Sequence, residues 1–156
     1  MQFHIAAVGR FGGGRAHAAE RALFERFAER IVPPPILVEV EDKRPLAAAE
    51  RRRREAELLL AASPTGAFVV ALDERGRQLT SPELAGRLGR LRDEGRRHVA
   101  FVIGGADGLD EAVRQAADLV LSLGPMTWPH LLVRGLIAEQ IFRAQSILAG
   151  HPYHRA

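Results

Sequence analysis

Short hydrophobic runs alternate with longer amphipathic segments along the whole chain. Five runs rich in β-branched residues are expected to form strands at residues 2–8, 36–40, 67–72, 98–103 and 118–123. The other segments have the spacing of helices at residues 15–30, 46–62, 81–93, 110–117 and 129–149, and Gly, Pro or Ser clusters separate several of them. Repeated strand and helix units predict an α/β fold in which a mostly parallel sheet carries helices on both faces.

The last expected helix, residues 129–149, is apolar around much of its circumference. Thr127 is its expected N-cap, and Gly150 and Pro152 are expected to end it. Its core stripe comprises Val133, Ile137, Ile141, Ala144 and Leu148. Further apolar residues widen this stripe: Leu132, Leu136, Phe142 and Ile147. So wide an apolar surface needs a second packing partner, and we expect a two-fold homodimer.

Composition limits the classes of protein that the chain can represent. Its 156 residues, 47% of them hydrophobic, are enough for a single domain, residues 1–156, with a substantial core. The absence of cysteine excludes disulfides, thiolate nucleophiles and cysteine-ligated zinc. No apolar run reaches the roughly 18 residues of a membrane span, and the start lacks the features of a signal peptide. We therefore expect a cytoplasmic protein without a membrane segment.

A net charge of +3 and a pI near 10.4 point towards nucleic acid, but the charge pattern weakens that interpretation. There are 21 arginines and one lysine, Lys43, a ratio that base composition of the gene can produce. The run Arg51 to Arg54 spreads around a helix instead of forming one stripe. Glutamates at i,i+4 spacing, such as Glu55 after Arg51, favour a solvated helix with ion pairs over a phosphate-binding face.

Candidate ligand-binding residues follow three of the expected strands. Ligands of open parallel sheets bind at the carboxyl ends of the strands, where this chain has "VALDERG", "IGGADGLD" and "SLGPMTWPH". Gly104, Gly105 and Gly108 would let a ligand approach the backbone closely. Apolar walls for an aromatic ring would come from Leu72, Leu123, Met126 and Trp128. For any one of these loops a simple turn is the favoured interpretation, but three such loops together favour a binding site.

Other motifs carry less. "VGRFGGGRAH" after the first strand has neither the P-loop lysine nor the glycine spacing of the dinucleotide fingerprint, so a flexible turn is favoured. His151 and His154 flank Pro152 without convincing further ligands, so no metal site is expected. No serine has the context of a nucleophile elbow, which disfavours covalent catalysis.

The segments "FVIGGADGLD", "LSLGPMTWPH", "LLVRGLIAEQIFRAQSI" and the terminal "HPYHRA" resemble the signature of the RlmH ribosomal RNA methyltransferases, within the SPOUT superfamily. The close resemblance covers about half of the chain. It implies a C-terminal trefoil knot, a homodimer and S-adenosyl-L-methionine as the cofactor. It also implies methylation of N3 of a pseudouridine in the helix 69 loop of 23S ribosomal RNA, within the assembled ribosome.

The resemblance places the cofactor contacts on Leu72, Gly104, Gly105, Leu123, Gly124, Pro125, Met126, Thr127 and Trp128. Methyl transfer to a ring nitrogen needs in-line positioning and removal of the N3 proton. The tail offers candidates for that chemistry: His151, Tyr153, His154 and Arg155. Arg155 would hold negative charge, because arginine cannot act as a base, while a histidine, Tyr153 or water would accept the proton.

His130 and Arg134 follow the cofactor loop closely enough to line the same cleft and bind the substrate. Alternatively, they cap the helix and form an interface salt bridge. Two other functions stay open at this point. One is a Rossmann-like nucleotide-binding protein that uses "GRFGGGRAH" as a phosphate loop, and the other is a non-enzymatic ribosome-binding factor.

Overall fold

The computed structural model describes residues 1–154 and contains a five-stranded sheet, five α-helices and a terminal 3-10 turn. The strands are β1 (Gln2–Val8), β2 (Ile36–Val40), β3 (Phe68–Gln78), β4 (His98–Ile103) and β5 (Leu119–Ser122). The helices are α1 (Ala18–Ala28), α2 (Ala48–Ala62), α3 (Ser81–Asp93), α4 (Glu111–Ala116) and α5 (His130–Leu148), and the turn is Pro152–His154. The bounds of the helices lie within three residues of those that the sequence predicts.

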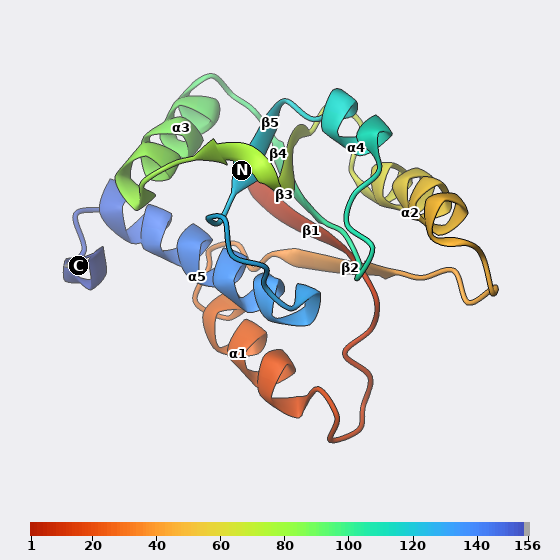
Figure 1. Cartoon of the computed structure of the whole chain (residues 1–156). Helices are drawn as coiled ribbons and strands as arrows, with labels where there is room; N and C mark the ends of the chain where they lie inside the picture. Colours follow the sequence, from red (N-terminus) through yellow and green to blue (C-terminus); the bar gives the residue numbers. More distant parts are fainter. Residues whose placement is uncertain (155–156) are drawn as a thin grey trace.

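All strand pairs are parallel, and the strand order is β2-β1-β4-β3-β5. Helices α1, α3 and α5 cover one face of the sheet, and α2 and α4 cover the other (Figure 1). The predicted α/β architecture with helices on both faces is confirmed.

The core has one layer on each side of the sheet. Along β1, Phe3 and Ile5 face the larger layer with α5, whereas Ala6 and Val8 face the smaller layer with α2 and α4. Alternation of side chains along a strand sends successive residues to opposite faces, and here both faces are buried. This explains why the strands appear in the sequence as continuous apolar runs.

Strand β3 continues six residues beyond its expected end at Leu72. Leu72 and Arg77 both pair with Leu121 of β5, so residues 73–76 leave the hydrogen-bonded ladder as a bulge. A β-carbon at Gly76 would lie 2.5 Å from the carbonyl oxygen of Val120, so glycine is required at that close approach. The bulge was not predicted, because the polar stretch "DERGRQ" lacks the apolar alternation of a strand.

Helix α5 begins one residue later than expected and is covered by α1 and α3 of its own chain. Thr127 is not its N-cap. Pro129 occupies that position, without a capping side-chain hydrogen bond. Val133, Ile137, Ile141 and Ala144 are buried as expected, whereas Leu148 is 39% exposed. Contacts within the chain account for part of the wide apolar surface, and the homodimer stays a prediction.

Two of the four arginines in the run on α2 form ion pairs with acidic residues, and the pair of Arg51 differs from the predicted one. Arg51 forms an ion pair with Asp107 at 3.1 Å instead of with Glu55. Arg54 pairs with Glu57 and Asp42. Within residues 1–154, no helix is both long and apolar enough to cross a membrane.

Candidate functional site

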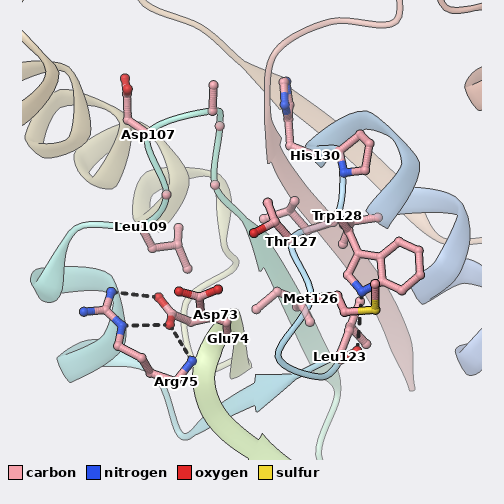
Figure 2. A pocket seen from close by; sticks show the side chains of 18 of the residues that line it. Asp73, Glu74, Arg75, Asp107, Leu109, Leu123, Met126, Thr127, Trp128 and His130 are labelled. Atoms are coloured by element: carbon pink, nitrogen blue, oxygen red, sulfur yellow. Dashed lines mark hydrogen bonds and ion pairs between the residues drawn. The ribbon is translucent and has the colours of Figure 1, made fainter.

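A cavity of about 660 Å³ lies at the carboxyl ends of β3, β4 and β5 (Figure 2). Three segments form most of its walls: 72–75 at the β3 bulge, 103–109 from the end of β4, and 121–130 around the end of β5 and the start of α5. The structure brings together here nearly all the residues that the resemblance assigns to the cofactor. These are Leu72, Gly104, Gly105, Leu123, Gly124, Met126, Thr127 and Trp128. Pro125 is exposed and does not line the cavity.

The 104–108 loop is a tight turn that closes on itself. The amide of Gly108 donates to the carbonyl of Gly105 at 3.0 Å, and Gly108 has a φ of 79°. A β-carbon at Gly104 would lie 2.9 Å from the carbonyl carbon of Gly108. These glycines are therefore required for the turn itself, and the turn presents its backbone to the cavity.

The 123–129 loop provides an apolar wall that is open to solvent. Met126 is 71% exposed and Trp128 is 42% exposed, unusual values for such large apolar side chains. The indole nitrogen of Trp128 donates to the carbonyl of Leu123 at 3.4 Å, and Gly124, with a φ of 106°, bonds to the Ser122 hydroxyl. An exposed aromatic ring beside a cavity suits the binding of a flat heterocycle.

An acidic wall faces this apolar one, and the sequence had not indicated it. Figure 2 shows Asp73 and Glu74, from the β3 bulge, on the side of the cavity opposite Met126 and Trp128. The sequence did not identify Asp73 and Glu74 as cavity residues, because it did not predict the bulge that carries them. The only sequence signal was that "VALDERG" follows a strand.

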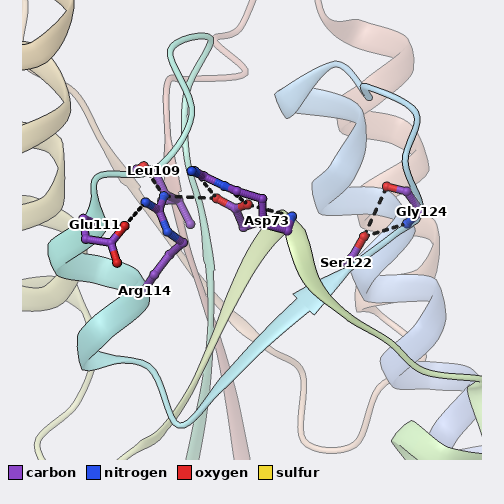
Figure 3. A network of polar contacts seen from close by, with 7 residues as sticks. Asp73, Leu109, Glu111, Arg114, Ser122 and Gly124 are labelled. Atoms are coloured by element: carbon purple, nitrogen blue, oxygen red, sulfur yellow. Dashed lines mark hydrogen bonds and ion pairs between the residues drawn. The ribbon is translucent and has the colours of Figure 1, made fainter.

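Two arginines hold Asp73 in place (Figure 3). Arg75 donates to it at 3.0 Å, and Arg114 of α4 approaches it at 3.3 Å while also donating to the carbonyl of Leu109 at 2.9 Å. Burial by itself raises the pKa of Asp73, but hydrogen bonds from Arg75 and the charges of both arginines outweigh it, so the pKa is lowered. The Asp73 carboxylate thus remains ionised and fixed, and it ties α4 to the cavity.

His130, at the start of α5, lines the cavity, and its ring packs on Gly9, where a β-carbon would lie 3.2 Å from Nε2. Burial lowers its pKa, and the positive charges of Arg134 and His17 lower it further. The imidazole is therefore neutral near pH 7 and able to accept a proton.

Arg134 lies behind the cavity wall and is 0% exposed. It donates to the carbonyls of Val8 at 3.0 Å and Gly9 at 2.9 Å, and to Glu39 at 2.6 Å. Its guanidinium also stacks 4.5 Å from the ring centre of Phe11. Of the roles expected for Arg134, the structure shows a salt bridge, formed within the chain, which fastens α5 to β1 and β2.

The glycine-rich segment after β1 is engaged in this same network. Its Phe11 amide donates to Glu39 at 2.8 Å, so a carboxylate lies where a phosphate loop would need its anion, and the Gly9 carbonyl is held by Arg134. Residues 9–17 do not line the cavity. These contacts favour a structural turn over a phosphate loop.

The described part of the tail packs on its own α5, at the end of the helix away from the cavity (Figure 1). The ring of Tyr153 lies 4.6 Å from that of Phe142, and its hydroxyl donates to Glu139 at 3.1 Å. Burial raises the pKa of Tyr153, as does Glu139. Nδ1 of His151 accepts from the Tyr153 amide at 3.2 Å. Neither residue lines the cavity of this chain.

His154 closes the 3-10 turn, and Arg155 lies outside the described residues. Among the side chains that the structure describes, no three His, Asp or Glu residues gather as a metal site would require.

Comparison with known proteins defines the class first. A family model described as "Predicted SPOUT methyltransferase" matches residues 1–154. A solved structure of a probable methylase family protein from Haemophilus influenzae Rd KW20 shares the fold, with a TM-score of 0.57 at 12% identity, over 99% of this chain and 70% of that one.

Curated relatives narrow the class further. Ribosomal RNA large subunit methyltransferase H of Paramagnetospirillum magneticum is 58% identical over 155 residues, 99% of each chain. The protein of the same name from Rhodospirillum centenum is 58% identical over 156 residues, all of each chain. The chain therefore belongs to the SPOUT methyltransferases and, among them, to the RlmH family of ribosomal RNA methyltransferases.

Proposed function

We propose that the protein transfers a methyl group from S-adenosylmethionine to N3 of a pseudouridine in the helix 69 loop of 23S ribosomal RNA, on the assembled ribosome in the cytoplasm. The observation that carries the proposal is the cavity of about 660 Å³. In a chain of this family, the cavity is lined by the three segments to which the resemblance assigns the cofactor contacts. Membership of the family also implies the trefoil knot in the part of the chain that carries these loops.

The residues around the cavity fit such a cofactor. Met126 and Trp128 offer an apolar surface for the adenine ring, and the backbone of the 104–108 loop offers close polar contacts. Asp73 and Glu74 provide carboxylates for hydroxyl groups or positive charge. When bound, the cofactor supplies an electrophilic methyl group.

The chain's own residues have to orient the substrate and accept a proton. Good orientation supplies roughly 7 to 11 kcal/mol of such a barrier. His130, neutral and on the cavity wall, can contact the base and accept the N3 proton. Arg134 would act on the substrate indirectly, since it is buried and reaches the cavity through Gly9 and His130.

The tail would complete the site in a homodimer. Tyr153, whose raised pKa keeps its hydroxyl protonated, can donate a hydrogen bond, and Arg155 can stabilise negative charge on the deprotonated ring. Because the described tail lies at the far end of α5 from its own cavity, we propose that it acts, with His151 and His154, on the partner's cofactor site.

The decisive experiment measures transfer of a labelled methyl group from S-adenosylmethionine to ribosomes, followed by mass mapping of 23S fragments from a deletion strain. The chain has few residues for reading bases beyond this site, so shape and phosphate charge should dominate recognition. Assembled ribosomes should therefore be methylated far faster than a free stem-loop. A protein that binds ribosomes without transferring methyl groups would be a non-enzymatic factor, and tighter binding of NAD or ATP than of S-adenosylmethionine would indicate a nucleotide-binding protein.

The composite site is tested by mixing two inactive variants, one truncated after Gly150 and one carrying Gly104→Val. If the tail acts on the partner, each mixed dimer regains one intact site, and random exchange restores about a quarter of wild-type activity. An inactive mixture whose heterodimers are seen by native mass spectrometry would contradict the arrangement in trans.

A further inference from the structure

Helix α2 carries a buried acidic side chain beneath the 104–108 loop. Glu55 is only 6% exposed, beside the core residues Ala56 and Leu59, whereas Glu57, two positions along, is exposed. Glutamate is rarely this buried without a partner. The position therefore calls for a physical explanation.

The Oε1 atom of Glu55 is shielded from solvent and has no hydrogen-bond partner in the described part of the chain. An unsatisfied polar atom of this kind lowers the stability of the fold. In a native fold such a group needs a specific explanation, and a role at a functional site is one of them.

The Glu55 carboxyl group lies next to Gly105 of the cavity loop. A β-carbon built on Gly105 would lie 3.3 Å from Oε2 of Glu55 and 2.8 Å from Cγ1 of Val8. These two side chains therefore occupy the space directly beside Gly105, where even a methyl group would press on them. A displacement of the Glu55 carboxyl group would move the loop, because interiors packed this closely transmit shifts.

Three charged groups surround Glu55. Asp107 lies in the loop itself, Arg51 is one turn earlier on α2, and Asp42 follows β2. Burial raises the pKa of Glu55 most, Asp107 and Asp42 raise it further, and Arg51 opposes them. Arg51 is engaged with Asp107 at 3.1 Å and with the carbonyl of Leu46 at 2.6 Å, so it does not pair with Glu55. The surroundings thus favour the uncharged acid.

We propose that Glu55 is a positioning residue of the cavity: its uncharged carboxyl group supports the 104–108 loop, and its ionisation displaces that loop. An ionised Glu55 would be a buried charge beside Asp107, and the loop would have to open to admit water. The effect of Glu55 on cofactor affinity rests on the proposed function. The effect of Glu55 on the position of the loop does not depend on it.

The proposal makes affinity depend on a single proton. If only the uncharged form binds S-adenosylmethionine well, the dissociation constant rises about tenfold for each pH unit above the pKa of Glu55. Glu55→Gln has nearly the same shape and cannot ionise. It should match the wild type at low pH and bind about tenfold more tightly one pH unit above that pKa. Glu57→Gln is the matched control, because it removes an exposed carboxylate from the same helix and should leave the pH profile unchanged.

The test combines two measurements between pH 5 and 8.5. Carbon-13 NMR of the Glu55 carboxyl group gives its pKa in the unliganded wild-type protein, and the amide signals of Gly105 and Gly108 should shift with the same midpoint. In Glu55→Gln this component of the shifts should vanish. Calorimetry with S-adenosylmethionine then gives the dissociation constants of the wild type and both variants.

The proposal would be overturned if the amide signals of Gly105 and Gly108 do not change as Glu55 titrates. It would also be overturned if the carbon-13 signal shows that Glu55 does not ionise up to pH 8.5. Identical pH profiles for the wild type and Glu55→Gln would overturn it as well. A wild type that binds no S-adenosylmethionine at any pH would instead refute the proposed function, and the NMR titration would still decide the role of Glu55.

Discussion

The buried guanidinium of Arg134 should be the most important single polar group for the stability of the cavity wall. It donates the hydrogen bonds that water would otherwise provide to the backbone carbonyls of Val8 and Gly9 and to the carboxylate of Glu39. The variant Arg134→Met keeps a long side chain in the same space and removes all three hydrogen bonds. It leaves Glu39 with the Phe11 amide as its remaining hydrogen-bond donor in the described structure.

The size of the effect follows from the burial of both partners. Removing one member of a buried ion pair costs about 3 to 5 kcal/mol, because the other charge remains without compensation. The Glu39 side chain is 23% exposed, so water can reach it, and the lower end of about 3 kcal/mol applies. In a chain of this length, that loss lowers Tm by about 6 to 12 °C.

Urea denaturation at pH 7 is the appropriate assay, with Arg53→Met as its control. Arg53 is exposed on α2, and no ion pair of it is seen within residues 1–154, so its replacement should change the free energy of unfolding by less than about 0.5 kcal/mol. The double variant with Glu39→Gln should recover about 1 to 2 kcal/mol of the loss, since no uncompensated charge remains. A loss below about 1 kcal/mol in Arg134→Met would refute this account of the network.

The pH dependence provides an independent check on the same pair. Burial by itself raises the pKa of Glu39, but the hydrogen bonds from Arg134 and Phe11 outweigh burial and lower it below 4.5. The stabilisation is therefore present above pH 4.5 and is lost as the pH falls through the lowered pKa. Arg134→Met should show a smaller loss of stability over that range.

Three further changes test other parts of the structure. Gly104→Val should abolish binding of S-adenosylmethionine in calorimetry, because even a β-carbon would meet the loop backbone at 2.9 Å, whereas Gly86→Ala, in open space, should not. Burial lowers the pKa of His4, and the charge of His98 lowers it further, so the free energy of unfolding should fall as the pH drops from 6.5 through that pKa, with a smaller slope in His4→Gln. Thr80→Ala removes the capping box of α3 and should cost about 1 kcal/mol in urea denaturation.

Much of the fold could be predicted because local and tertiary signals agree. The strands at residues 2–8 and 98–103 are apolar on both faces, so their ends were found without error. The sequence did not predict the β3 bulge, because its register is fixed by pairing with β5, which is far away in sequence, and Gly76 is the one local residue that this close approach requires. A polar stretch can belong to a strand when a neighbouring strand provides the hydrogen bonds, and the sequence of the stretch does not reveal that neighbour.

The same distinction between local and long-range signals applies to the candidate site. Glycines and exposed apolar residues at strand ends could be recognised, because a known topological rule indicates where to look. The supports of the site could not, since each joins distant segments: Asp73 meets Arg114, Glu39 meets Arg134, and Glu55 meets Gly105. The local sequence of α2 does not distinguish a buried glutamate from a solvated one. The prediction that Arg51 pairs with Glu55 was therefore wrong, because Glu55 is buried and Arg51 pairs with Asp107 instead.

The separation between the cavity and the tail can be explained by the path of α5. The helix starts with His130 on the cavity wall and runs 19 residues, a rise of roughly 28 Å at 1.5 Å per residue, before the tail begins. Tyr153 then packs back on Phe142 and Glu139, so its hydroxyl lies near the middle of the helix, roughly 14 Å along the axis from His130. A single chain that keeps these contacts holds its tail well away from its own cavity. For the tail to take part in chemistry, either it leaves α5 or a second copy brings its own tail to this cavity. The contacts of Tyr153 oppose the first route, which is why the mixed-dimer experiment discriminates so directly between the two.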